Sequence, residues 1–194
     1  MIRALLQLPD RIFAWVEPAS TPVLTTLARF VFAAVLFWYY WNSGFTKIPD
    51  GISNLFSPSF NAFAQIFPKG AEAAGYDIAQ ATAFQKAVVL AGTWTEFILP
   101  LLIVLGLFTR AAAFGMIGFV IVQSLTDLYG HGGIEHAATL GAWFDHLPGG
   151  LILDQRAFWV FLLLYLVFKG GGPLSLDRVF LRSEPSLHPD DPLR

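Results

Sequence analysis

Residues 84–108 read FQKAVVLAGTWTEFILPLLIVLGLF, an almost unbroken apolar run with one acid in its middle. A helix of about 20 residues crosses a hydrocarbon core about 30 Å thick, so this run is long enough to span a bilayer. Three more stretches have the same character: residues 23–45, residues 111–128, and residues 158–168 with flanks from Leu151 or Asp154 to Lys169. The sequence therefore predicts an all-α fold, an integral membrane bundle of four helices. A re-entrant segment is the alternative for residues 141–154.

The composition of the whole chain agrees with this fold. Of the 194 residues, 55% are hydrophobic and 13% are charged, whereas soluble domains carry about 25% charged residues. We therefore expect the lipid bilayer to be the main contact of the protein. The net charge of −2 supplies no basic stripe, so nucleic acid is excluded as a partner. The chain has no Cys, which excludes thiolate nucleophiles and Cys-ligated metal centres.

Two short segments flank the membrane domain, which we assign to residues 21–182. Residues 1–20 end at Pro18 and predict an interfacial amphipathic helix. Its apolar face consists of Leu5, Leu8, Ile12 and Trp15 with Val16. Residues 183–194 are rich in Pro and charge, which is typical of a disordered tail. The loop at about residues 46–82 carries several Phe residues, which favours a loop packed on the bundle or dipping into the interface.

The distribution of basic residues predicts the orientation. With four spans, the side of the two termini carries seven basic residues and the opposite side carries four. The first set is Arg3, Arg11, Arg110, Lys169, Arg178, Arg182 and Arg194, and the second is Lys47, Lys69, Lys86 and Arg156. Because basic residues favour the cytoplasmic side, we expect both termini in the cytoplasm and the loops at 46–82 and 129–154 outside.

Glu96 is the acid in the middle of the second span, about twelve residues from either end of its apolar run. A carboxylate at mid-membrane costs about 2.5 to 3.5 kcal/mol on insertion scales, so Glu96 should face the bundle interior and either pair or stay protonated. Pro100 has no N–H and leaves the Glu96 carbonyl without its helical partner. Thr93 shares the same helical face. Two interpretations stay open: a structural bond between helices, or a site that carries a proton.

Two basic residues accompany Glu96. Arg29 lies about 9 Å inside the first span, where it either reaches back to the interface or pairs with Glu96. Lys47 ends the same span and acts either as an interfacial anchor or as a ligand for an anionic substrate. Arg110, in the short turn between the second and third spans, is expected to anchor that turn to lipid head groups.

The loop after the third span gathers three of the chain's four His residues with several acids. His131, Glu135 and His136 are candidate metal ligands, since transition metals accept imidazole and carboxylate together. The segment also contains Gly130, Gly132 and Gly133, and an ordinary solvated loop is the alternative.

Several short motifs, in order, resemble the DoxX family of small four-span membrane proteins over about residues 25–182. They are Arg29, Gly44-Phe-Thr-Lys47, Glu96, Gly106-Leu-Phe-Thr109-Arg110 and Gly172-Pro173-Leu-Ser175-Leu-Asp177. The chain departs from the family at Leu99 and Pro100, where members often carry a Gly pair.

The resemblance implies a bacterial inner-membrane protein that serves a redox process, with quinone as the possible cofactor and a protein partner or homo-oligomer as the expected assembly. The chain would then be a subunit of a quinone-linked oxidoreductase, with Glu96 as its catalytic residue. Its quinone or substrate site would comprise Arg29, Lys47, Thr93, Trp94 and Pro100. The alternatives are a non-enzymatic membrane anchor for a redox or oxidative-stress enzyme, and a small proton-coupled carrier.

Overall fold

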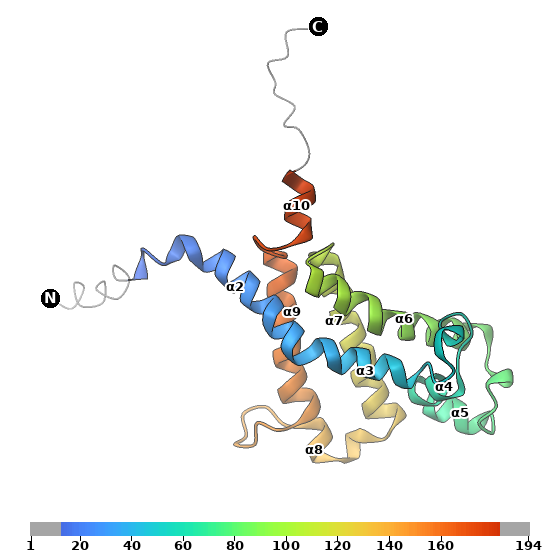
Figure 1. Ribbon diagram of the computed structural model, residues 1–194. Helices are drawn as coiled ribbons and strands as arrows, with labels where there is room; N and C mark the ends of the chain where they lie inside the picture. Colours follow the sequence, from blue (N-terminus) through green and yellow to red (C-terminus); the bar gives the residue numbers. More distant parts are fainter. Residues whose placement is uncertain (1–12, 183–194) are drawn as a thin grey trace, which may run out of the picture.

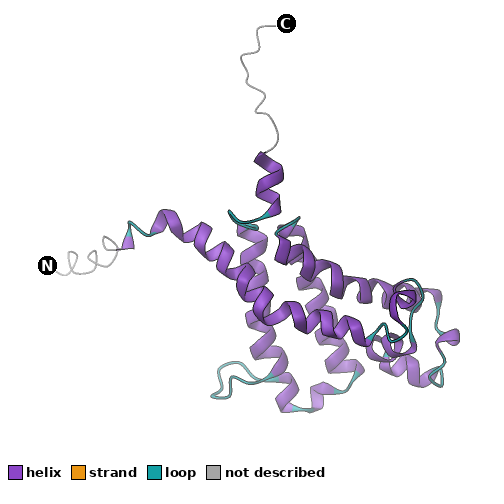
Figure 2. Ribbon diagram, viewed as in Figure 1, coloured by secondary structure: helices purple, strands orange, loops and turns teal. Residues whose placement is uncertain are grey.

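The computed structural model describes residues 13–182, and every regular element in this part of the chain is a helix (Figures 1 and 2). Four helices are long and apolar enough to cross a membrane: Glu17–Thr46, Ala83–Leu105, Thr109–Gly130 and Leu151–Lys169. The predicted all-α bundle of four spans is therefore confirmed. The fourth span begins at Leu151, so residues 151–154 belong to a membrane helix.

The spans consist of the following elements. The first is α2 (Glu17–Phe32), a π-helical turn η1 (Ala33–Phe37) and α3 (Trp38–Thr46). The second is α6 (Ala83–Leu105), and the third is α7 (Thr109–Leu125) with the π-helical turn η4 (Thr126–Gly130). The fourth is the π-helical turn η6 (Leu151–Arg156) with α9 (Ala157–Lys169). Between the third and fourth lie η5 (Gly133–Glu135) and α8 (Ala137–Leu140).

The ends of α6 show why its sequence forms a helix of this length. Thr82 and Gln85 form a capping box, in which each side chain bonds the backbone N–H of the other residue. Gly106 ends the helix in the left-handed conformation, with φ of 69°. A side chain at Gly106 would collide with Ser175, since a Cβ there would lie 2.6 Å from the Ser175 Cβ.

The interior of the bundle is apolar and aromatic. It contains Phe32, Leu36, Tyr40, Ile103, Met116, Val120, Leu163 and Leu166, all nearly or fully buried. The outer faces are also apolar: Phe30, Phe114 and Phe161 are each 66–71% exposed. Large apolar side chains on both the inner and the outer faces of a bundle indicate that lipid is the surrounding solvent.

Residues 48–82 form a helical cap over one end of the bundle. Its elements are η2 (Gly51–Leu55), α4 (Phe60–Ile66), α5 (Pro68–Ala73) and η3 (Ile78–Gln80). Ala62, Phe63 and Ala71 of the cap pack with Val89 of α6 in a second small core. The expectation that this loop packs on the bundle therefore agrees with the structure, although its short helices were not expected.

The two ends of the chain differ in part from the expectation. Residues 1–12, most of the expected interfacial helix, and residues 183–194, the expected disordered tail, lie outside the described residues. Glu17–Ser20 belong to α2, because Pro18 stands in the first turn, where proline starts a helix. A further helix, α10 (Leu176–Arg182), follows the fourth span and projects away from the bundle (Figure 1).

Candidate functional site

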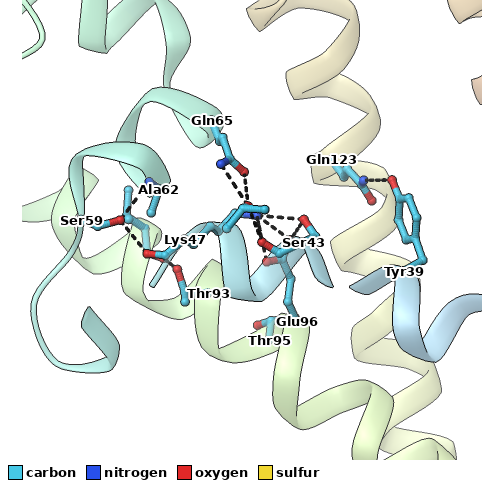
Figure 3. Close-up of polar contacts among 12 residues, drawn as sticks. Tyr39, Ser43, Lys47, Ser59, Ala62, Gln65, Thr93, Thr95, Glu96 and Gln123 are labelled. Atoms are coloured by element: carbon cyan, nitrogen blue, oxygen red, sulfur yellow. Dashed lines mark hydrogen bonds and ion pairs between the residues drawn. The ribbon is translucent and has the colours of Figure 1, made fainter. Parts of the chain in front are cut away.

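Glu96 forms a buried ion pair with Lys47 (Figure 3). The Lys47 ammonium donates to both carboxylate oxygens, with Nζ 2.9 Å from Oε1 and 2.8 Å from Oε2. The hydroxyl of Ser43 donates to Oε1 at 3.0 Å and accepts from Lys47 Nζ at 3.0 Å. Glu96 is 3% exposed and Lys47 is 5% exposed. Lys47 is therefore neither an interfacial anchor nor a free cation.

The backbone around Lys47 holds its side chain in place. Lys47 directly follows α3, and its N–H bonds the carbonyl of Gly44. The Lys47 carbonyl accepts a 2.6 Å bond from the hydroxyl of Ser59, the residue that also caps the start of α4. Its side chain then reaches back one turn along α3 to Ser43, where it meets the carboxylate of α6. The helical cap thus covers the pair from the end of the bundle.

A close approach of α3 and α6 brings the two charges together. Gly44 faces the ring of Phe97, and a Cβ at Gly44 would lie only 2.6 Å from the tip of that ring. Trp41 donates a 3.1 Å bond to the Phe97 carbonyl, and the rings of Trp41 and Phe45 pack edge-on against Phe97. This aromatic group lies beside the ion pair on the same two helices. The residue after Glu96 therefore fixes the distance between the helices.

The other residues expected at this site have separate roles. Pro100 is buried in α6 one turn after Glu96 and supplies no N–H to the Glu96 carbonyl. Thr93 is buried, and its hydroxyl bonds the Val89 carbonyl of its own helix. Trp94 is 41% exposed, and its indole N–H bonds the Leu55 carbonyl, which ties the cap to α6. Trp94 therefore holds the cap against α6.

Arg29 does not pair with Glu96. Its guanidinium donates to backbone carbonyls of Ile103 at 3.0 Å, Gly171 at 3.1 Å and Leu174 at 2.6 Å, and also to that of Val104. Two of these carbonyls lie at the C-terminal end of α6, where the helix dipole favours a cation. Arg29 therefore joins three parts of the chain at the bundle end opposite the cap.

Asp177 completes the same region. Its carboxylate accepts bonds from the N–H groups of Phe108 and Thr109 at 2.6 and 2.9 Å, and from the Thr109 hydroxyl at 2.7 Å. Its own N–H bonds the carbonyl of Gly106. We call Arg29, residues 106–109 and residues 171–177 the clasp. Two sequence motifs that lie far apart along the chain are thus one structural unit.

His131, Glu135 and His136 are not brought together. In residues 13–182, no group of three or more His, Asp and Glu side chains is arranged to hold a metal ion. The His131 ring lies 3.0 Å from the Gln65 carbonyl of α4, whereas Glu135 and His136 are exposed. The glycines around these residues break the helix that would have placed His131 and Glu135 on one face, as Gly132 adopts a φ of 73°.

A second ion pair was not expected from the sequence. Arg156, which is 3% exposed, bonds Asp127 at 2.5 Å and the hydroxyl of Ser124 at 2.9 Å. It joins the third span to the fourth. The sequence does offer a signal for this pair: the acid Asp127 stands at the end of the third apolar run, and the base Arg156 stands near the start of the fourth.

Three buried side-chain atoms in the described part of the chain have no hydrogen-bond partner: Tyr40 Oη, Gln123 Oε1 and Arg156 Nε. They belong to one region of the interior. The Tyr40 ring and the Arg156 guanidinium both pack on Trp159, and Gln123 donates a 3.0 Å bond to the Tyr39 hydroxyl (Figure 3). Tyr40 lies one turn before Ser43 on α3. We call Tyr39, Tyr40, Gln123, Arg156 and Trp159 the polar layer, since their side chains contact one another between the first, third and fourth spans.

The four apolar helices, the capped end and the buried charges define a small multi-pass membrane protein. The model of the DoxX family matches residues 24–126, more than half of the chain, and the protein belongs to that family. The matched region contains Arg29, Lys47 and Glu96, whereas Arg156 and Asp177 lie beyond it. No curated protein and no solved structure matches the chain.

Proposed function

We propose that this DoxX protein is a membrane subunit of a quinone-linked redox process, and that Glu96 exchanges a proton for that process. The buried Lys47–Glu96 pair carries this proposal. Desolvation offsets most of the attraction within a buried ion pair, so such a pair is weak evidence for a purely stabilising role. Ionisable groups inside membrane proteins mark proton and substrate sites by default.

The residues around the pair suit a quinone head group. A quinone takes up two protons and two electrons as it becomes a quinol. The Glu96 carboxyl can hold one proton, and the adjacent Lys47 ammonium stabilises the carboxylate that forms when this proton leaves. The Ser43 hydroxyl is a further donor, and the rings of Trp41 and Phe97 offer apolar surface. The electrons come from a partner enzyme.

The polar layer described above supports proton exchange at a sealed site. Buried polar atoms without a protein partner are usually satisfied by internal water. We propose that internal water satisfies Tyr40, Gln123 and Arg156 and carries protons between Glu96 and Asp127, whose side chain is 28% exposed. Glu96 takes up the two protons one after the other from the aqueous side and passes each to the quinone, while the cap stays closed.

The test separates proton exchange from structural pairing. Glu96→Gln removes the titrating group, and Glu96→Gln with Lys47→Met removes both charges. Each single change, Glu96→Gln or Lys47→Met, should lower the stability of the protein, and the double variant should regain it. The double variant should nevertheless remain inactive in quinone reduction by native membranes. Full activity in the double variant would leave the pair with a structural role only. Leu99→Met, a volume-conserving change in the same helix, serves as the control.

A second candidate function is that of a non-enzymatic anchor for a partner enzyme. The loop between α8 and η6 supports it, since Trp143, Phe144 and Leu147 are 62%, 104% and 61% exposed. Exposed aromatic residues on a loop suit a protein interface. Replacing Phe144 and Leu147 with Ser would then abolish co-purification of the partner, whereas Glu96→Gln would leave that co-purification unchanged.

A further inference from the structure

A pocket of about 970 Å³ opens beside the clasp. The start of α7, the end of α9 and the first turns of α10 form its walls. Most of its lining is apolar, with contributions from Leu107, Phe108, Ala111 and Phe180. Thr109 begins the third span and Lys169 ends the fourth, so the pocket lies where two spans leave the membrane.

Three basic side chains from three different elements line this pocket: Arg110, Lys169 and Arg178. All three are exposed, and none has a hydrogen bond or ion pair through its side chain within residues 13–182. Arg110 extends over Gly170, since a Cβ at Gly170 would lie 3.3 Å from Arg110 Nε. The one acid of the lining, Asp177, uses both carboxylate oxygens to cap α7. Asp177 keeps its negative charge, but within residues 13–182 none of the three cations forms an ion pair with it, and three cations against one carboxylate leave the lining with a formal excess of positive charge.

From this charge pattern and the apolar lining, we propose that the pocket binds an anionic phospholipid. The phosphate lies among Arg110, Lys169 and Arg178, and the acyl chains cover Phe108 and Phe180. Basic pockets between membrane helices at the head-group level bind acidic lipids in this way. This site is separate from the Lys47–Glu96 pair at the other end of the bundle, and its occupancy does not depend on the redox role.

The test measures which lipid the purified full-length protein retains. The protein is placed in mixed micelles with equal amounts of phosphatidylglycerol and phosphatidylcholine of the same acyl chains, and bound lipid is counted by native mass spectrometry. We expect a clear preference for phosphatidylglycerol. Arg110→Gln with Lys169→Gln should weaken its binding about thirtyfold, because each basic residue near a membrane surface contributes about 1 kcal/mol.

The matched control is Lys69→Gln with Lys86→Gln, which removes two positive charges at the cap end and should leave lipid retention unchanged. A second measurement needs no variant. For the unaltered protein, raising the ionic strength from about 0.05 M to about 0.5 M should reduce the preference for phosphatidylglycerol, since screening shortens the Debye length. Inorganic phosphate alone should not displace the lipid.

Several results would overturn the proposal. Equal retention of the two lipids by the unaltered protein would show that charge does not select the occupant. Unchanged retention in the Arg110 and Lys169 variant, or an equal loss in the Lys69 and Lys86 control, would show that the pocket is not the site. Displacement by inorganic phosphate would assign the cations to a free anion.

Discussion

Lys47 and Glu96 compensate each other in a place where either charge alone would be unstable. Both are at least 95% buried, and the ammonium contacts both carboxylate oxygens. Removing one partner of a buried pair costs about 3 to 5 kcal/mol, whereas removing both is often neutral. The strength of the pair therefore appears only when its partners are changed one at a time.

Lys47→Met should destabilise the purified protein by about 3 to 5 kcal/mol, because Glu96 then lacks its cation. The double change with Glu96→Gln should be markedly less destabilising than the sum of the two single changes. Reversible unfolding in mixed micelles, followed by helix content, measures all three variants. Additive effects would contradict direct coupling of the two side chains.

The sequence identified both residues of this pair but not their contact. Glu96 is conspicuous as an acid in an apolar run, and Lys47 stands at the end of another. From the sequence alone, Lys47 is expected at the interface, because hydropathy does not show that the helical cap, held by Ser59, covers it. For Arg29 the sequence leaves two interpretations, a reach back to the interface and a pair with Glu96. The pair is wrong, because the long Arg side chain reaches free backbone carbonyls at the end of α6 instead.

Among the helices, the crossing of α3 and α6 controls the site. Gly44→Ala should destabilise the protein by about 1 to 3 kcal/mol, because the new Cβ meets a Phe97 ring that Trp41 and Phe45 already confine. Gly118→Ala in α7 is the matched control, since nothing lies within 4 Å of a Cβ there. Thermal unfolding compares the two. Similar losses would show that the crossing at Gly44 tolerates a side chain.

The start of α7 depends on a residue from beyond the fourth span. Asp177→Ala should destabilise the protein by about 1 to 2 kcal/mol, since it removes a charged cap from two N–H groups. Asp145→Ala, which removes one bond to Leu147 in an exposed loop, should have almost no effect. The unfolding temperature of each variant is the measurement. Equal shifts of the unfolding temperature in the Asp177→Ala and Asp145→Ala variants would show that the Asp177 cap contributes no more to stability than the bond in the exposed loop.

At the scale of the whole molecule, the orientation in the membrane can be tested by labelling single introduced Cys residues. The natural chain has no Cys, so it contributes no background labelling. Single Cys residues at Lys69 and His136 should react with an impermeant thiol reagent on intact cells, because the basic residues favour cytoplasmic termini. Cys at Arg178 should react only after the cells are opened. The reverse pattern would place the cap in the cytoplasm.

The four spans were predictable because a hydrocarbon solvent demands long apolar helices, which hydropathy detects directly. The cap and α10 were not, since short helices such as α4 and α5 leave no long periodic pattern. The clasp was also missed as a unit. Its motifs at residues 106–110 and 172–177 are visible in the sequence, but only the closed bundle places them side by side.

The clasp also ties assembly to the order of synthesis. Arg29 enters the membrane with the first span, whereas two of its carbonyl partners, Gly171 and Leu174, are translated after the last. A chain cut short before residue 171 keeps an intramembrane guanidinium with half of its acceptors missing, and α7 lacks the carboxylate that caps it. Residues translated after the last span thus complete the bonds that the first helix leaves open, and the clasp closes only once the chain extends to Asp177.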